Sequence, residues 1–149
     1  MNRILVMHGV NLNLFGKRDP KHYGTETLED INGKLSALAG ELGVEVSFFQ
    51  SNYEGAFVER IHEAHGDGTA GIVLNAGAWT HYSYAIMDAL GILSIPVVEV
   101  HMSNVHAREE FRHHSVLSTV SAGSIAGFGV DSYLLGLRAA CSLLERKDA

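Results

Sequence analysis

The sequence predicts a three-layer α/β domain in which helices cover both faces of a parallel sheet of about five strands. Two observations indicate this class. Short apolar runs of strand length alternate along the chain with longer segments whose apolar residues recur at helical spacing. The strand candidates are apolar throughout, which is typical of strands that are buried on both faces of a parallel sheet. The 149 residues show no repeat, low-complexity tract or linker, so we expect one domain spanning residues 1–149.

The first half of the chain provides two strands and two helices. Residues 4–7 form the first apolar run and residues 44–49 the second. Between them, five apolar residues at helical spacing predict a helix that ends at Gly43. They are Leu28, Ile31, Leu35, Leu38 and Leu42. A second helix, which ends at Gly66 and Gly68, is predicted from Phe57, Val58, Ile61 and Ala64.

The second half repeats the alternation. Residues 72–74 predict a third strand, and residues 95–100 a fourth, with Pro96 near its beginning, where a missing backbone donor does least harm. The helix between them is predicted from Ala85, Ile86, Ala89, Leu90 and Leu93. A final helix is expected from about residue 132 to residue 146. Residues 121–127 have little β-propensity, but the alternation requires a fifth strand there.

Composition excludes several classes of function. The net charge of −6 argues against a non-specific nucleic-acid binder, which needs a basic face. The single Cys141 excludes an internal disulfide and a cysteine metal cage, and we interpret it as a buried thiol. Neither a secretory signal nor an apolar run near the ~20 residues of a membrane span is found, so we expect a cytoplasmic protein without a membrane partner. A charged fraction of 19%, below the usual ~25%, indicates surface hidden in subunit contacts.

Polar loops follow the first, third and fourth strands. They span residues 8–24, 75–81 and 101–114. In the strand order 2-1-3-4-5 these three strands are neighbours, so their loops would meet at the edge where parallel sheets bind ligands. The first loop exceeds the usual ~2–6 residues and is typical of a lid or binding loop. The third gathers histidine, hydroxyl, carboxylate and guanidinium groups, which suit a site that moves protons and holds an anion.

Separate sequence blocks then point to one family. They comprise Gly9 to Leu14, Arg18-Asp19-Pro20 with Tyr23-Gly24, Gln50-Ser51-Asn52 with Glu54-Gly55, Asn75 to Ala78 with Thr80-His81, Glu99-Val100-His101 through Arg112, and Gly127-Phe128-Gly129. In this order and spacing the chain resembles the type II 3-dehydroquinate dehydratases over nearly its whole length. The resemblance implies a flavodoxin-like α/β/α sandwich with a five-stranded parallel sheet in the order 2-1-3-4-5. Val10, Ala76 and Trp79 depart from the residues common in the family, but none of these changes removes a group that performs chemistry.

The resemblance also implies a reaction and an assembly. The reaction is the anti elimination of water from 3-dehydroquinate to 3-dehydroshikimate through an enolate, without metal or other cofactor. It serves the shikimate pathway of aromatic amino acid biosynthesis, although the sequence is equally compatible with quinate breakdown. Members form trimers that assemble into homododecamers.

By the same resemblance, Tyr23 is the base, acting as tyrosinate. A free tyrosine has a pKa of ~10, so neutral pH leaves roughly one molecule in a thousand ionised, a deficit of about 4 kcal/mol. A guanidinium at ~4 Å supplies about 4 kcal/mol at an effective dielectric near 20. Arg18, in the same loop, is the expected cation, and Arg108 and Arg112 are further candidates.

His101 is the expected general acid, because the unperturbed pKa of histidine, ~6.5, is near working pH. Glu99 lies two residues earlier on the same side of a strand and would orient the imidazole. Asn11 would hold a water or hydroxyl near the developing enolate, and the remaining residues are expected to bind substrate. Those residues are Asn75, His81 and Arg112 through their side chains, Met102 and Ser103 through backbone amides that hold the carboxylate, and Asp88, whose family counterpart reaches the site of a neighbouring subunit.

Two other functions remain open on the sequence. A metal-dependent hydrolase would draw on Glu99, His101, His106 and His81, although an i,i+5 separation between His101 and His106 fits one helix face poorly. A non-enzymatic anion-sensing module of the same fold would need no set of tyrosine, arginine and histidine. Outside that alternative, His106, His113 and His114 of the third loop are interpreted as solvated helix or interface groups without chemistry.

Overall fold

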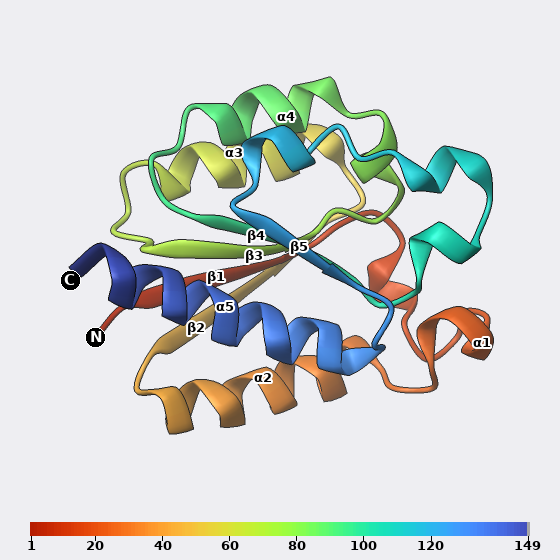
Figure 1. The fold of residues 1–149 in the computed structure, drawn as a ribbon, viewed down its shortest axis with the longest axis horizontal. Helices are drawn as coiled ribbons and strands as arrows, with labels where there is room; N and C mark the ends of the chain where they lie inside the picture. The colour runs from red at the N-terminus through yellow and green to blue at the C-terminus, as the bar shows by residue number, and fades with distance from the viewer. Residues whose placement is uncertain (149) are drawn as a thin grey trace.

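The structure, a computed structural model that describes residues 1–148, is built on one parallel sheet in the order β2-β1-β3-β4-β5 (Figure 1). The strands are β1 Arg3–His8, β2 Glu45–Gln50, β3 Gly71–Asn75, β4 Val97–His101 and β5 Gly123–Ala126. The predicted fold class and strand order are therefore confirmed. Because the order reverses between β1 and β3, a crevice forms there at the carboxyl ends of the strands.

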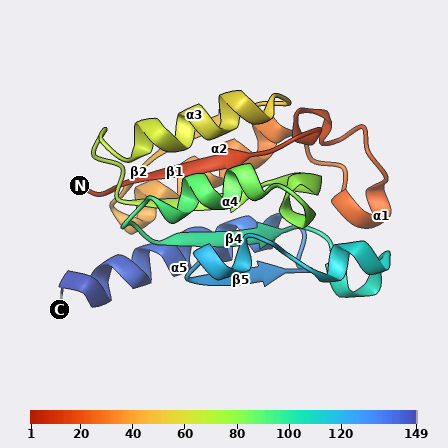
Figure 2. The same ribbon diagram turned by 90° about the horizontal axis from the view of Figure 1, so that it is seen from above.

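Four long helices cover the two faces of this sheet. Helices α2 (Leu28–Leu42) and α5 (Val130–Asp148) lie on one face, and α3 (Glu54–Ala64) and α4 (Tyr84–Gly91) lie on the other (Figures 1 and 2). Alternate residues of each strand enter the two cores. On β1, for example, Val6 packs with the α2 and α5 side, whereas Leu5 packs with the α3 and α4 side. None of the helices in the described residues is long and apolar enough to cross a membrane.

Local sequence signals fix the ends of α2. The Thr27 side chain accepts a hydrogen bond from the Asp30 backbone, and the Asp30 side chain accepts one from the Thr27 backbone, so the helix begins with a capping box. Gly43 follows the last turn at a φ of 71°, in the left-handed region that favours glycine. The predicted end of this helix at Gly43 is confirmed.

The bounds of the first three strands differ from the predictions by one residue at each end, and those of the fourth and fifth differ more. The fourth strand begins at Val97, so the predicted start at residue 95 is wrong, because Pro96 has no N–H to donate to a ladder. The fifth strand exists but covers only Gly123–Ala126, paired in parallel with β4 from Val98 to His101. It is an edge strand of small residues, held by its pairing rather than by intrinsic propensity.

The polar loops contain short helices that the sequence did not predict. In the first loop, α1 spans Pro20–Tyr23 and begins where the Asp19 side chain accepts from the Lys21 N–H. The segment that follows β4 forms three 3-10 turns, η3 Val105–Ala107, η4 Glu110–His113 and η5 Ser118–Val120. Two more follow β1 and β3, η1 Leu12–Leu14 and η2 Gly77–His81. Figure 1 shows α1 and the η3–η4 segment side by side at the end of the sheet opposite the N-terminus.

Candidate active site

A pocket of about 140 Å³ lies where the loops after β1, β3 and β4 meet. It is lined by every predicted site residue except Glu99 and Asp88, that is, by Asn11, Arg18, Tyr23, Asn75, His81, His101, Met102, Ser103 and Arg112. Arg108 also lines it. A wider hollow of about 480 Å³ between α2 and α5 contains none of these residues. The predicted convergence of the three loops on one edge is therefore what the structure has.

Tyr23, the last residue of α1, accepts hydrogen bonds from two arginines. Its hydroxyl oxygen lies 3.0 Å from Nη2 of Arg18 and 2.8 Å from Nη1 of Arg108. The ring packs on Phe15, with the centroids 6.2 Å apart, and the residue is half-buried. A guanidinium can only donate, so the Tyr23 oxygen is the acceptor in both bonds and has two positive charges beside it.

Arg108 comes from the segment after β4 and joins the two sides of the pocket mouth. The same Nη1 donates to Ser103 Oγ at 3.1 Å, and only 9% of the side chain is exposed. Its nearest carboxylate, that of Glu109, is 3.8 Å away. Arg112, by contrast, donates from Nε to Glu109 at 3.2 Å while it lines the pocket. From the sequence, both arginines were candidates for a second cation beside Tyr23. In the structure it is Arg108 that contacts the Tyr23 hydroxyl.

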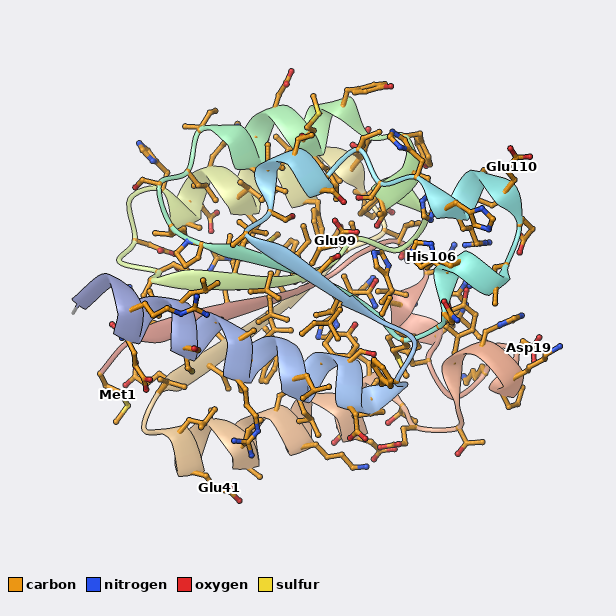
Figure 3. All side chains as sticks on the ribbon, in the orientation of Figure 1. Met1, Asp19, Glu41, Glu99, His106 and Glu110 are labelled. Atoms are coloured by element: carbon orange, nitrogen blue, oxygen red, sulfur yellow. The ribbon has the colours of Figure 1, made fainter. Side chains whose placement is uncertain are left out.

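Glu99 and His101 form a buried pair on β4. Glu99 Oε2 lies 2.6 Å from His101 Nε2, so the expected orientation of the imidazole by Glu99 is matched by a direct contact. The other carboxylate oxygen accepts from Ser115 at 2.9 Å and from Ser118 at 3.3 Å. Figure 3 shows Glu99 close to the middle of the molecule, whereas the segment that carries His106 and Glu110 lies at one end of it.

These contacts set the charge of the pair. Burial alone would raise the pKa of Glu99, but hydrogen bonds from His101 and the two serines, with the charge of His101, outweigh it and lower the pKa. Glu99 is therefore a carboxylate whose negative charge lies directly against the His101 ring. Because Glu99 takes Nε2, the nitrogen left for a ligand in the pocket is Nδ1. Ser115 and Ser118 were missed by sequence reasoning, since isolated serines in a loop carry no signal of such contacts.

His81 stacks beside His101, with ring centroids 6.4 Å apart. Its Nδ1 lies 2.9 Å from the backbone oxygen of His114, so Nδ1 carries the proton and donates. Burial, followed by the positive charges of His101 and Arg112, lowers the pKa of His81. The ring is consequently neutral near pH 7, and Nε2 is a hydrogen-bond acceptor suited to a hydroxyl group.

Two asparagines flank the opposite wall of the pocket. Asn11 has a φ of 68° and is the one non-glycine residue with positive φ in the described residues; its N–H donates to Asn52 Oδ1 at 2.8 Å. Asn75, at the end of β3, accepts from the Gly77 N–H at 3.2 Å and donates from Nδ2 to the Tyr133 hydroxyl at 3.0 Å. The Asn75 side-chain amide is therefore held by two protein partners, whereas at Asn11 it is the backbone N–H that is held.

The remaining predicted residues fall in two groups. Met102 and Ser103 are buried at the start of the segment after β4 and line the pocket, as a carboxylate cradle requires. Asp88 is exposed on α4 and lies outside the pocket, so the single subunit does not bring it to the site. Its proposed role depends on a neighbouring subunit and stays a prediction.

The residues on which the metal-hydrolase alternative depends do not form a metal-binding group in the described part of the chain. Across residues 1–148, no three histidine, cysteine, aspartate or glutamate side chains are grouped as metal ligands. His101 Nε2 is occupied by Glu99, and His106 packs against His113, with centroids 6.2 Å apart. The geometry of these side chains gives that alternative no support.

Comparison with known proteins shows similarity over the whole domain. The model of the family described as dehydroquinase class II matches residues 2–141. A 3-dehydroquinate dehydratase of Leptothrix cholodnii is 63% identical over 146 residues, covering 98% of each chain. One of Syntrophotalea carbinolica is 61% identical over 145 residues, covering 97% of this chain and 98% of the relative. The crystal structure of type II dehydroquinase from Butyrivibrio crossotus matches with a TM-score of 0.91 at 46% identity, covering 93% of this chain and 97% of that one.

Proposed function

Because the chain belongs to the class II dehydroquinase family, we propose that it is a hydro-lyase that removes water from 3-dehydroquinate to give 3-dehydroshikimate. One observation carries the chemical part of the proposal. A single pocket holds a tyrosine hydroxyl bonded to two guanidinium groups and a histidine backed by a carboxylate. The first group is suited to take a proton from carbon, and the second is suited to release one to oxygen.

In the first step, the Tyr23 phenolate takes the proton on the carbon next to the ketone, and the electron pair of the C–H bond moves into an enolate. The charges of Arg18 and Arg108 support the ionised phenol. The enolate needs hydrogen-bond donors in fixed positions, and Asn11, through a side-chain amide or a water it holds, is the proposed source.

In the second step, the enolate reforms the ketone, the carbon–oxygen bond of the β-hydroxyl breaks, and His101 supplies the proton that turns the leaving hydroxyl into water. Glu99 supports this role because its carboxylate stabilises the charged imidazolium before the transfer. After the reaction, Tyr23 holds a proton and His101 lacks one, so passing that proton from the phenol to the imidazole, directly or through solvent, restores the enzyme.

Substrate binding is assigned to the other residues of the pocket. His81 Nε2 would accept from a substrate hydroxyl, and Arg112 and Asn75 would donate to hydroxyl oxygens. The backbone amides of Met102 and Ser103 would hold the carboxylate. None of these roles needs a metal or organic cofactor.

We further propose a cytoplasmic homododecamer built from trimers, acting in the shikimate pathway. Asp88 and two exposed tyrosines, Tyr82 and Tyr84, cluster on or next to α4, and the tyrosines are 58% and 64% exposed. Exposed aromatic side chains of this kind are enriched in interfaces. In this assembly Asp88 would complete the pocket of a neighbouring subunit, which would make activity depend on association.

The proposed function is tested by the ultraviolet absorbance that follows addition of 3-dehydroquinate, because the conjugated product absorbs and the substrate does not. The purified chain should give a steady rise. Tyr23→Phe should lower the rate at least about 100-fold, the lower range for loss of a general base, while calorimetry still detects substrate binding. Tyr53→Phe, at an exposed tyrosine outside the pocket, is the matched control and should react like the parent. A flat trace from folded parent protein, or an unimpaired Tyr23→Phe variant, would contradict the proposal and favour a sensing module.

A further inference from the structure

Beneath the pocket, two titratable side chains are buried that the proposed reaction does not use. His8, at the end of β1, and Tyr133, on α5, both have no exposed surface. The hydroxyl of Tyr133 lies 2.9 Å from Nδ1 of His8, and Nε2 of His8 lies 2.8 Å from Oδ1 of Asn32 on α2. Tyr133 also accepts from Nδ2 of Asn75, which lines the pocket. A chain of hydrogen bonds thus runs from α2 through the core to the pocket wall.

The direction of each bond in this chain is determined by its two ends. The Gly77 N–H donates to Asn75 Oδ1, so the Asn75 amide must present Nδ2 to Tyr133. Tyr133 already accepts there, and its own proton therefore goes to Nδ1 of His8. His8 must then be neutral, with its proton on Nε2, where Asn32 Oδ1 accepts it. Burial supports the neutral form, since it lowers the pKa of His8 to about 4 and raises that of Tyr133.

This direction has a consequence for the pocket. Asn75 Nδ2 carries two hydrogens, and Tyr133 receives one of them. Oδ1 is engaged by the Gly77 N–H, so the donor that Asn75 has left for a ligand is the second N–H of Nδ2. A rotated amide would offer an acceptor instead, would lose the bond from the Gly77 N–H and would reverse the bond to Tyr133. The buried chain therefore selects which hydrogen-bonding character Asn75 offers to the pocket.

We propose that Tyr133, oriented by His8, is a positioning residue that holds the Asn75 amide with its free N–H toward a substrate oxygen. This inference rests on the proposed dehydratase function, because it assigns Asn75 a donor role in that reaction. A purely structural account leaves the arrangement unexplained. Apolar side chains at both positions 8 and 133 would fill the same space without two buried polar groups that need partners, and buried polar groups are expensive when any partner fails.

The first test is a double-mutant cycle on kcat/KM for 3-dehydroquinate with Tyr133→Phe, Asn75→Ala and the double variant. If Tyr133 acts through Asn75, we expect about a tenfold loss for Tyr133→Phe and a larger loss for Asn75→Ala, with the double variant no worse than Asn75→Ala. Losses that multiply would overturn the inference, because they would mean that Tyr133 acts independently of the amide. Leu137→Val, also buried on α5 but apolar, is the control for lost packing and should keep the parent kcat/KM even if the melting temperature falls.

A second measurement needs no variant at position 133 and decides the matter if Tyr133→Phe does not fold. Nitrogen-15 NMR of the parent protein near pH 7 should show His8 neutral with the proton on Nε2, the signals being assigned by their absence in His8→Gln. A protonated ring, or a proton on Nδ1, would reverse the bond to Tyr133 and overturn the inference. Both outcomes are separable from failure of the proposed function, which would appear as an inactive parent protein.

Discussion

The contact between Arg108 and Tyr23 permits a quantitative test of the proposed base. Replacing Arg108 with leucine removes a donor 2.8 Å from the Tyr23 oxygen and a positive charge whose centre is about 4 Å away. At an effective dielectric near 20, one such charge stabilises an anion by about 4 kcal/mol, and this is a ceiling because water will enter the space left by the side chain. With Arg18 still in place, we expect a loss of about 2–3 kcal/mol, or roughly 30- to 150-fold in kcat/KM near pH 7.

The assay is the initial rate of product absorbance, measured from pH 6 to pH 9 for the parent and for Arg108→Leu. The proposed base acts only in its deprotonated form. Because loss of a nearby cation makes deprotonation harder, the rising limb of the variant's profile should move to higher pH. The ratio of parent to variant rates should therefore be largest at low pH and shrink as the pH rises. Arg138→Leu, the same charge change at an exposed position on α5, should leave the profile unchanged.

Two results would refute this reasoning. An unchanged kcat/KM would mean that Arg108 does not contribute to the base. A deficit that grows as the pH rises would mean that Arg108 serves another step, such as holding the substrate, and that Arg18 alone supports the ionised tyrosine.

Three further predictions concern residues around the pocket. Glu99→Gln should lower kcat about 10- to 100-fold at neutral pH while the circular dichroism stays unchanged, because the carboxylate that favours the imidazolium is lost; a fully active variant would exclude Glu99 as partner of the acid. His8 should make folding pH-dependent: its pKa is about 4 when folded and 6.5 when exposed, so below pH 6.5 the unfolded chain binds the extra proton and stability falls. Between pH 6.5 and pH 4 this amounts to about 3 kcal/mol, measurable as a steeper loss in urea unfolding than His8→Asn shows; equal slopes would contradict the burial of a neutral ring. Asp88→Ala should reduce turnover without lowering the stability of the subunit fold, and full turnover in an intact assembly would remove Asp88 from the site.

The regular part of the fold was predictable because each core element carries its own pattern. Helix α2, for example, combines apolar spacing, a threonine cap and a terminal glycine, and all three act within the segment itself. Strand β5 was expected only because the alternation demanded it, and it is held by pairing with β4. Helix α1 and the 3-10 turns after β4 have no such internal pattern, being too short for a period to show.

The site was predictable to the extent that strand geometry fixes it. Residues two apart on a strand share a side, and the 2.6 Å contact between Glu99 and His101 follows from that rule. The contacts of Ser115 with Glu99 and of Tyr133 with Asn75 depend on how separate elements pack, and they join positions 16 and 58 residues apart. The family resemblance supplied the roles of the pocket residues, but spacing alone gives no reason to pair α5 with the end of β3.

The two cations on Tyr23 differ in how they reach it, and this difference bears on when the base exists. Arg18 is five residues from Tyr23 in the same loop, so the two move together. Arg108 is 85 residues away, on the segment after β4, and it meets Tyr23 only when α1 lies against that segment. If α1 swings away, Tyr23 loses the contact with Arg108, and the water that enters screens the charge of Arg18 that remains. The proposed base therefore has both of its arginine contacts only while the first loop covers the pocket, so proton abstraction is tied to exclusion of water from the site.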